Sequence, residues 1–435
     1  MPTTTAWSST SAHGWRGTDS RPRSSCGGCD GGRGRLIAMP DIRPQRPRLL
    51  FIVTEDWAFL RHRLPMARAA LDMGMEVAVA TRVSEHADAI QGLGFTVFHT
   101  PVERAGLSPI GDLRYLARLI GVLRRFRPQL IHNVAAKPIL YGTLAARLCA
   151  RGARVINAFT GLGILFTDDG AKRSLKSRLL GGLLMGMLRR LCGNKQVHML
   201  VQNEDDQSFL AARGIGRAER NHLIPGSGVD LAQFLVTPEP PAPPVRAVLV
   251  GRLLKTKGVE EFVQAARILK GRGCDIHMAL VGAPDPGNPT TVTQDQIDAW
   301  VAEGLVEWTG ERNDIAAVWA GAHIAVLPSY REGLPKSLLE AAACARPLIA
   351  TDVPGCRALV RDGENGLLVP PRDTVALADA IERLAADGGL RRTYGAAARR
   401  DVEARLSQDR IAAAVQRLYA EVLGDPALPP APDQA

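Results

Sequence analysis

The sequence predicts an α/β protein of two doubly wound domains, and three observations carry this prediction. Short apolar runs alternate with helical patterns along most of the chain, as they do where crossover helices join parallel strands. The length of 435 residues is sufficient for two such domains. A proline-rich segment, residues 238–244, divides the alternation into two parts and is expected to link the domains.

The first domain is expected to span residues 48–237. Continuous apolar runs predict its strands, because a strand of a parallel sheet is covered on both faces. The predicted strands are Arg48–Val53, Glu76–Ala80, Phe95–Phe98, Gln129–Val134 and Arg154–Ala158. A loop at residues 54–59 and a helix from about Leu60 are expected next. Ligands bind beyond the carboxyl ends of such strands, which places His132 and Lys137 near a cleft, although a strand histidine is equally often packed.

The second domain is expected to span residues 245–407 and to bind a phosphorylated ligand. Its predicted strands are Arg246–Val250, Asp275–Val281, Leu305–Thr309 and His323–Pro328. Arg252 and Lys257 follow the first of these strands, beside the start of a helix. Two cations at the carboxyl end of a strand are suited to a diphosphate. The alternative interpretation is that both belong to surface salt bridges.

The stretch from Leu327 to Ala341 carries the clearest functional pattern. A buried strand turns through a polar loop into an apolar helix, with Pro335 expected at the first helical position. Glu332 in the loop and Glu340 in the helix frame the turn, and the amides at residues 333–336 would offer donors to a phosphate. The alternative is a plain surface turn with a solvated glutamate.

This Glu-X7-Glu pattern resembles the signature of the retaining nucleotide-sugar glycosyltransferases of family 4, which have the GT-B fold. Val250–Gly258 is similar to the diphosphate loop of that family, and Pro347–Gly355 to the segment after its signature helix. The resemblance covers roughly residues 48–423. The first half, with Leu60–Pro65, resembles the subgroup of bacterial N-acetylgalactosaminyltransferases that act on polyprenyl-diphosphate-linked sugars.

The resemblance implies two Rossmann-like domains that face a cleft, with the sugar donor bound by the second. It implies that Arg252, Lys257 and Glu332 are catalytic, and that Glu340 holds the ribose. The implied donor contacts are Gly251, Arg252, Lys257, Arg312, Glu332, Gly333, Leu334, Pro335 and Glu340. The candidate acceptor or phosphate contacts are His62, Arg63, Lys137, Thr160 and Gly161. The family's usual histidine of the first domain is absent, because Phe159 and Thr160 occupy the aligned positions.

The function implied is transfer of a hexose or N-acetylhexosamine from a UDP-sugar to a lipid-linked saccharide, with retention of configuration. No cofactor or metal is expected, because the chain contains no Asp-X-Asp motif. Two alternatives remain open. One is a nucleotide-sugar epimerase of the same fold, and the other is a nucleotide-sugar binder without catalytic activity.

The charge is unevenly distributed and suggests a membrane surface as a partner. Of the net charge of +10, half comes from the first 48 residues, which hold eight Arg and three Asp. Residues 1–47 are expected to be a disordered basic arm, and residues 424–435 a frayed tail. Residues 171–195 contain seven basic and no acidic side chains among leucines and methionines. This pattern predicts a helix on an anionic membrane, or else one packed on the first domain.

Other uses of the positive charge are disfavoured. No aromatic residues interleave with the basic ones and no nucleic-acid-binding module is recognisable, so we expect no nucleic acid partner. Seven scattered cysteines favour a reducing compartment, and the expected location is the cytoplasmic face of the membrane. Residues 408–423 predict a last helix that crosses back to the first domain.

Overall fold

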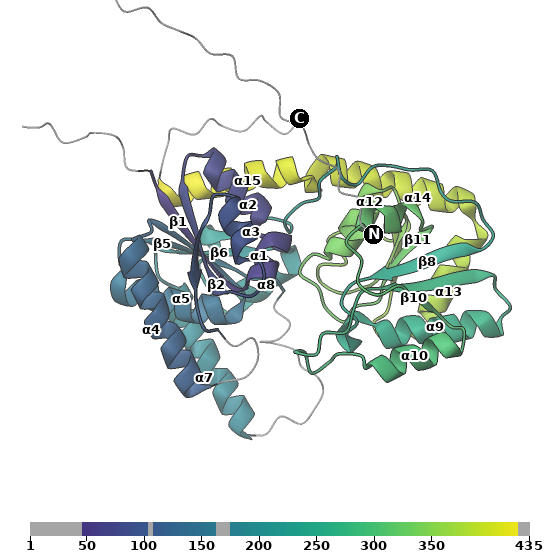
Figure 1. The fold of residues 1–435 in the computed structure, drawn as a ribbon, viewed down its shortest axis with the longest axis horizontal. Helices are drawn as coiled ribbons and strands as arrows, with labels where there is room; N and C mark the ends of the chain where they lie inside the picture. The colour runs from purple at the N-terminus through teal and green to yellow at the C-terminus, as the bar shows by residue number, and fades with distance from the viewer. Residues whose placement is uncertain (1–45, 103–107, 162–174, 425–435) are drawn as a thin grey trace, which may run out of the picture. The chain divides into compact units, whose positions relative to one another are not determined.

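The computed structural model contains two β-sheets, each built of parallel strands, and describes residues 46–102, 108–161 and 175–424 (Figure 1). The first sheet has seven strands in the order β3-β2-β1-β4-β5-β6-β7. The second has six, in the order β10-β9-β8-β11-β12-β13. In each sheet the chain starts at an inner strand, moves to one edge and returns to build the other side. This is the doubly wound order that the sequence predicts, and the fold class is confirmed.

The strands mostly begin and end within two residues of their predicted positions. Those of the first sheet are β1 (Arg48–Glu55), β2 (Glu76–Arg82), β3 (Thr96–His99), β4 (Leu130–Val134), β5 (Arg154–Ala158), β6 (Val197–Val201) and β7 (Asn221–Leu223). Those of the second are β8 (Val245–Val250), β9 (Ile276–Val281), β10 (Glu307–Trp308), β11 (Ile324–Leu327), β12 (Leu348–Thr351) and β13 (Gly366–Val369). The sequence reasoning gave no bounds for β6, β7, β12 and β13.

Helices cover both faces of each sheet. In the first half they are α1 (Asp56–His62), α2 (Leu64–Asp72), α3 (Ala87–Gly92), α4 (Pro109–Phe126), α5 (Ala136–Cys149), α7 (Leu175–Cys192) and α8 (Glu204–Ala212). In the second half they are α9 (Val259–Gly271), α10 (Gln294–Ala302), α11 (Ile315–Ala320), α12 (Lys336–Ala343), α13 (Thr374–Ala386), α14 (Gly388–Asp401) and α15 (Gln408–Leu423). A short turn of helix, η2 (Lys255–Lys257), precedes α9.

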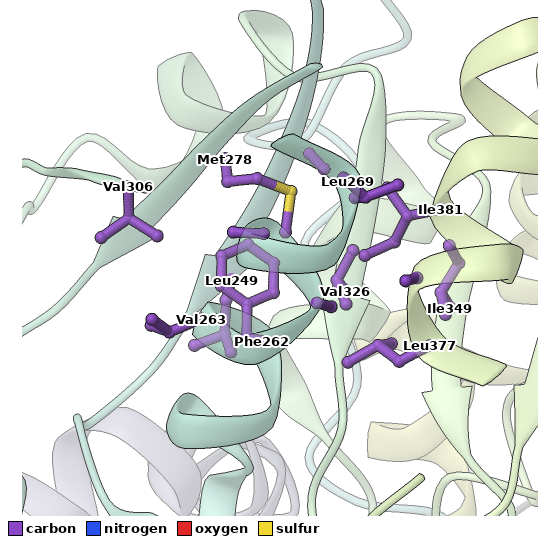
Figure 2. Packing of buried hydrophobic residues seen from close by; sticks show 14 of the residues in the cluster. Leu249, Phe262, Val263, Leu269, Met278, Val306, Val326, Ile349, Leu377 and Ile381 are labelled. Carbon is purple, nitrogen blue, oxygen red and sulfur yellow. The ribbon is translucent and has the colours of Figure 1, made fainter. Parts of the chain in front are cut away.

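Alternate residues of each central strand enter opposite cores. Leu50 and Ile52 of β1 pack in one hydrophobic cluster, while Leu49 and Phe51 pack in another across the sheet. The same division holds for β8. Figure 2 shows the cluster on one face of the second sheet, in which Leu249 packs with residues of α9 and α13. Because side chains of a strand point alternately to its two faces, continuous apolar runs are needed wherever helices cover both.

The last helix, α15, packs on the first sheet although it follows the second in sequence. Ile411, Val415 and Leu418 belong to the cluster that contains Leu49 and Phe51 of β1. The carboxamide of Gln416 donates a hydrogen bond to the carbonyl of Ala69 in α2 at 3.3 Å. In Figure 1 this yellow helix lies beside α2. The two halves of the chain are therefore joined twice, at residues 238–244 and through α15.

The proline-rich segment is anchored to the second domain along its length. The guanidinium of Arg346, which is buried, donates to Thr237 Oγ1 at 2.7 Å and to the carbonyl of Pro238. Arg391 pairs with Glu239 at 3.2 Å, and His323 Nε2 lies 3.1 Å from the carbonyl oxygen of Pro240. These contacts hold the segment against the second sheet.

Three local expectations are corrected. Residues 54–59 are not a loop, because β1 continues to Glu55 and α1 begins at Asp56. The Asp56 carboxylate is buried and accepts a hydrogen bond from the backbone N–H of Ser84 at 2.6 Å. Pro335 is the N-cap of α12 and not its first residue, since its ψ of 107° is extended. The same helix ends at Ala343, two residues early, because Ala345 adopts a left-handed φ of 56°.

Several expectations fall on residues outside the described part of the chain. The arm at 1–47 is represented only by Arg46 and Pro47, and of the tail at 424–435 only Gly424 is described. The basic segment 171–195 is described from residue 175, where α7 begins. Among the described residues, no helix combines the length and the apolar character needed to cross a bilayer.

Candidate active site

The predicted donor residues gather where the order of the second sheet reverses. Strands β8 and β11 are hydrogen-bonded neighbours, but the chain leaves β8 towards β9 on one side and leaves β11 towards β12 on the other. The loops that follow these two strands therefore lie at the switch point of the sheet, at the carboxyl ends of the strands. Residues 251–257 follow β8 and residues 328–335 follow β11. Such a switch point is where ligands bind in open α/β sheets.

Lys257 and Glu332 meet at this point. Oε1 of Glu332 accepts hydrogen bonds from Lys257 Nζ at 2.5 Å and from Ser329 Oγ at 2.6 Å. Ser329 is held in turn, because its carbonyl oxygen accepts the hydroxyl of Thr351. The carboxylate is thus fixed between a cation and a hydroxyl group. A side chain held in this way can position a neutral sugar hydroxyl without first reorganising.

Gly258 permits the approach of the Lys257 loop. Its φ is +73°, and a Cβ atom at this position would collide with the carbonyl oxygen of Pro328 at the end of β11. A residue with a side chain would therefore push η2 and α9 away from the Glu332 loop. Glycine is required here by both the backbone conformation and the close contact.

The other two predicted cations have acidic partners of their own. Arg252 Nη1 lies 2.6 Å from Asp285 Oδ2, in the loop after β9. Arg312 Nε lies 2.6 Å from Oδ1 of Asp314, two residues away on the surface. The structure brings Lys257 and Glu332 together but leaves Arg252 and Arg312 in separate pairs. Both pairs are at least partly exposed, and a diphosphate could compete for the guanidinium groups.

Glu340 lies in a pocket formed by both halves of the chain. The pocket has a volume of about 170 Å³, and its lining includes Arg61 from α1, Asn313 and Ile315 from the second domain, and Lys336 and Glu340 from α12. Glu340 is 9% exposed. Burial raises the pKa of its carboxyl group, and the positive charges of Lys336 and Arg61 oppose that rise. Lys336 Nζ lies 3.8 Å from Glu340 and donates to the carbonyl of Arg61 at 2.8 Å.

His62 in the first domain faces these cations. Burial lowers the pKa of its imidazole to about 3, helped by the charges of Lys336, Arg63, Arg61 and Lys257. His62 follows Arg61, whose carbonyl oxygen accepts a hydrogen bond from Lys336 Nζ, so it lies near the start of α12. It is neutral at physiological pH, so it can exchange hydrogen bonds with a ligand but cannot neutralise a phosphate.

Of the other first-domain candidates, two are engaged inside that domain. Arg63 is almost fully buried, with Nη1 3.5 Å from Met66 Sδ, and burial lowers its pKa to about 10. Lys137 Nζ donates to Asp112 Oδ1 at 2.9 Å. His132, also expected near the cleft, is fully buried, with Nδ1 2.8 Å from the hydroxyl of Tyr419. It is therefore a packed histidine.

Thr160 and Gly161 instead contact the signature loop. A Cβ atom built on Gly333 would lie 2.7 Å from the carbonyl oxygen of Thr160, and one built on Gly161 would lie 3.3 Å from the backbone nitrogen of Gly333. Leu334 packs against Gly226, where an added Cβ would approach its side chain to 2.8 Å. The loop before α12 is thus enclosed by the first domain.

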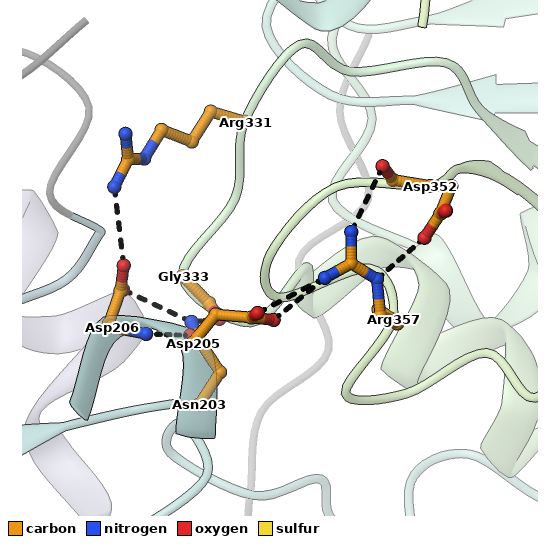
Figure 3. Close-up of polar contacts among 7 residues, drawn as sticks. All are labelled: Asn203, Asp205, Asp206, Arg331, Gly333, Asp352 and Arg357. Atoms are coloured by element: carbon orange, nitrogen blue, oxygen red, sulfur yellow. Dashed lines mark hydrogen bonds and ion pairs between the residues drawn. The ribbon is translucent and has the colours of Figure 1, made fainter. Parts of the chain in front are cut away.

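Sequence reasoning missed the residues that complete this enclosure. The side-chain amide of Asn203 donates a hydrogen bond to the carbonyl of Gly333 at 2.8 Å, and Arg331 Nη2 lies 3.3 Å from Asp206 Oδ1 (Figure 3). The pattern Asn-Glu-Asp-Asp at residues 203–206 predicts a helix start, which is correct, since Asn203 caps α8. Nothing in that local pattern signals a contact with the second domain.

Comparison with known proteins decides the family. Residues 244–387 match the family described as glycosyl transferases group 1, and residues 48–191 match the glycosyl transferase 4-like family. The chain belongs to these glycosyltransferases. One matched region contains β1 to β5 and the other contains β8 to β13. The enzyme class and the GT-B fold that the signature implied are confirmed.

Relatives of this glycosyltransferase build glycans and polysaccharides. The N,N'-diacetylbacillosaminyl-diphospho-undecaprenol alpha-1,3-N-acetylgalactosaminyltransferase of Campylobacter jejuni is 27% identical over 79% of this chain and 91% of its own length. The capsular polysaccharide biosynthesis glycosyltransferase CapM of Staphylococcus aureus is 23% identical over 74% of this chain and 84% of its own.

Two solved structures share the fold. Sucrose-phosphate synthase from Thermosynechococcus elongatus has a TM-score of 0.72 at 23% identity, covering 87% of this chain and 100% of that structure. Anabaena HepE in complex with UDP and glucose has a TM-score of 0.67 at 18% identity, covering 87% of this chain and 99% of that one. At these identities the similarity establishes the architecture of the enzyme and not its substrates.

Proposed function

We propose that the enzyme transfers a sugar, a hexose or an N-acetylhexosamine, from a UDP-sugar to a lipid-linked saccharide with retention of configuration. The observation that carries the proposal is the placement of Lys257, Glu332 and Glu340. Lys257 and Glu332 form one pair at the switch point of the second sheet, and Glu340 lies in a pocket at the start of α12 that Lys336 also lines. The bound UDP in the HepE structure supports the choice of donor.

These three side chains and Arg252 divide the work by their chemistry. Glu340 and the pocket around it accept the ribose hydroxyl groups, with Asn313 and Ile315 on the side of the base. Lys257 and Arg252 stabilise the negative charge that builds on the departing diphosphate. Glu332 orients the hydroxyl groups of the sugar, and the backbone amides before α12 offer further donors.

No covalent sugar–enzyme bond is needed in this scheme. The bond between the anomeric carbon and the diphosphate oxygen breaks as the acceptor hydroxyl attacks from the same face, and the acceptor proton passes to the leaving phosphate. Glu332 is already bonded to Lys257 and Ser329, which favours a positioning role over that of a nucleophile. The charge of the leaving group is met by side chains, so we propose that turnover needs no metal ion.

The acceptor proposal rests on the Campylobacter jejuni relative, whose name specifies an undecaprenyl-diphosphate-linked saccharide. A lipid-linked acceptor requires the enzyme to work at a membrane. A second pocket, of about 680 Å³, lies between α5 and α7, with apolar side chains and Arg147, Arg151 and Arg190 in its lining. We propose that this basic surface docks on anionic phospholipid, because it combines apolar area with cations that attract lipid headgroups.

The test is an assay of the purified enzyme with a panel of UDP-sugars, with and without a lipid-linked saccharide. We expect release of UDP that depends on the acceptor, an α-linked product from an α-linked donor, and unchanged rates in EDTA. Inhibition by EDTA with rescue by Mn²⁺ would refute the metal-free scheme. Conversion of the donor to its epimer without acceptor would favour the epimerase, and donor binding without turnover would favour the silent binder.

The variant Glu332→Gln separates the two retaining mechanisms. It keeps the shape and hydrogen-bonding capacity of the side chain, so it should retain measurable activity if Glu332 only orients the sugar. A complete loss, together with a trapped sugar–protein adduct in the native enzyme, would instead indicate double displacement through a covalent intermediate.

A further inference from the structure

The side chain of Asn203 connects the first domain to the signature loop of the second. Asn203 follows β6 and caps α8, and it is 2% exposed. Its Oδ1 accepts the backbone N–H of Asp206 at 2.7 Å, so its Nδ2 is left to donate. Nδ2 bonds to Asp206 Oδ2 at 3.1 Å and to the carbonyl oxygen of Gly333 at 2.8 Å. Figure 3 shows the start of α8 turned towards this loop.

A second contact ties the same loop to the same helix. Arg331 Nη2 lies 3.3 Å from Oδ1 of Asp206, a carboxylate that is 1% exposed. Asp206 therefore binds Asn203 with one oxygen and Arg331 with the other. Burial raises the pKa of this carboxyl group, while Arg331 and Asn203 oppose the rise.

The two anchored residues, Arg331 and Gly333, flank Glu332. Gly333 is also enclosed by backbone, because a Cβ atom on Gly355 would collide with the carbonyl oxygens of Gly333 and Glu332. The segment that carries the Gly333 carbonyl therefore has little room to move on the side of Gly355. A bond at that carbonyl fixes the peptide directly after Glu332.

We propose that Asn203, supported by Asp206, is a positioning residue of the transfer reaction. From the first domain it holds the Arg331–Gly333 segment so that Glu332 meets the donor sugar in a productive orientation. The donor site is then complete only while the first domain is docked on the signature loop. This inference rests on the proposed function, because it takes Glu332 as the residue that orients the sugar.

Three variants separate positioning from folding. Ser, Asp and Asn are equally good helix caps, so Asn203→Ser and Asn203→Asp keep α8 capped but lose the amide that reaches Gly333. Asn203→Ser should lower kcat by about 10- to 100-fold, because a small misplacement of a reacting group has an effect of that size. Asn203→Asp should lower kcat further, because it places a carboxylate oxygen against the carbonyl oxygen of Gly333.

The control is Asp205→Asn on the same helix. Asp205 also reaches the second domain, with Oδ1 3.1 Å from Arg357 Nη1, but that pair is exposed and does not touch the Glu332 segment. This variant should keep the native kcat.

The readouts are kcat, donor KM and the melting temperature of each full-length variant. We expect kcat to fall for Asn203→Ser while donor KM changes less than about threefold and the melting temperature stays near that of the native enzyme. An unchanged kcat in Asn203→Ser, or an equal loss in Asp205→Asn, would overturn the inference. Absence of transfer in the native enzyme would instead reject the proposed function, so the two failures are distinguishable.

Discussion

At the scale of single residues, two lysines of the turn η2 have different partners. Lys257 is bonded to the proposed sugar-orienting carboxylate, whereas Lys255, on the same helical turn, pairs with Glu260 on the surface at 3.2 Å. These two lysines therefore form a matched pair for mutation. Their side chains have the same charge and lie in the same segment, but only one belongs to the proposed site.

Lys257→Ala and Arg252→Ala should each lower kcat by about 10²- to 10³-fold, because they remove charge that matters most when the leaving diphosphate is fully charged. Donor KM should rise less than kcat falls. Lys255→Ala should behave as the native enzyme does. Steady-state kinetics at saturating acceptor measure both constants. If Lys257→Ala raised donor KM and left kcat unchanged, the result would contradict a role of Lys257 in the transition state.

Glu340 is expected to show a conflict between stability and function. Burial raises its pKa in the folded state, so the unfolded state releases the proton first as pH rises. The ionised carboxylate therefore destabilises the folded state. This loss of stability is absent at low pH and is complete above the pKa of Glu340 in the folded protein. Glu340→Gln should therefore melt at a higher temperature than the native enzyme at pH 8, with the difference vanishing near pH 4.

The same Glu340→Gln change should raise donor KM by about 10- to 100-fold, because hydrogen bonds to a charged group are worth about 1.5–3 kcal/mol. Thermal melting across pH 4–8 and steady-state kinetics test the two halves separately. A lower melting temperature at pH 8 would show that the charged carboxylate stabilises the fold.

At the scale of elements, α15 is the piece whose placement matters most. It closes one face of the first sheet, and its Tyr419 hydroxyl supplies the partner of the buried His132 Nδ1 at 2.8 Å. The other ring nitrogen of His132 has no hydrogen-bond partner in the described part of the chain. The histidine therefore depends on α15 for its single polar contact there.

Tyr419→Phe should lower the free energy of unfolding by about 1–3 kcal/mol, because a buried ring nitrogen loses its partner. Activity at low temperature should be retained, since neither residue faces the donor pocket. Tyr394→Phe is the control, because Tyr394 is also buried in a helix but has no hydrogen bond through its hydroxyl among the described residues. Denaturant unfolding measures both variants, and equal losses would show that the effect does not come from the contact with His132.

At the scale of the whole molecule, the proposal places the basic surface of the first domain on a membrane. The full-length protein should float with anionic vesicles at low salt and less at high salt, because salt screens the attraction. Replacing Arg147, Arg151 and Arg190 together with Gln should lower the affinity for anionic vesicles by about 100-fold, at about 1 kcal/mol for each cation. Vesicle binding that changes neither with salt nor with these substitutions would contradict the proposed docking surface.

The control for that experiment is a triple change on the second domain. Arg267, Arg272 and Arg383 are basic side chains of helices on the other half, and Arg267 and Arg272 are exposed and paired with acids. Their replacement with Gln should leave flotation unchanged. Zwitterionic vesicles complete the test, since they offer the same apolar interior without the negative headgroups.

The sequence determined the fold class, and it predicts where the proposed donor site lies. Apolar runs, glycines and prolines act locally, so they predict strands, helices and the linker without knowledge of their partners. The Glu-X7-Glu spacing and the loop with Lys257 follow two strands, and the rule for parallel sheets places both at one edge. Ala345 has a conformation that its residue type does not predict, because its φ of 56° is left-handed although it is not a glycine.

Only the tertiary structure decided which groups meet across the chain. Asn203 and Gly333 are 130 positions apart, and His132 and Tyr419 are 287 apart. Local pattern identified Asn203 as a helix cap and His132 as a strand residue, and each description is correct. Their partners depend on the order of the strands and on the return of α15 to the first sheet. Those are properties of the packed molecule, because contacts between distant segments form only where burial brings the segments together.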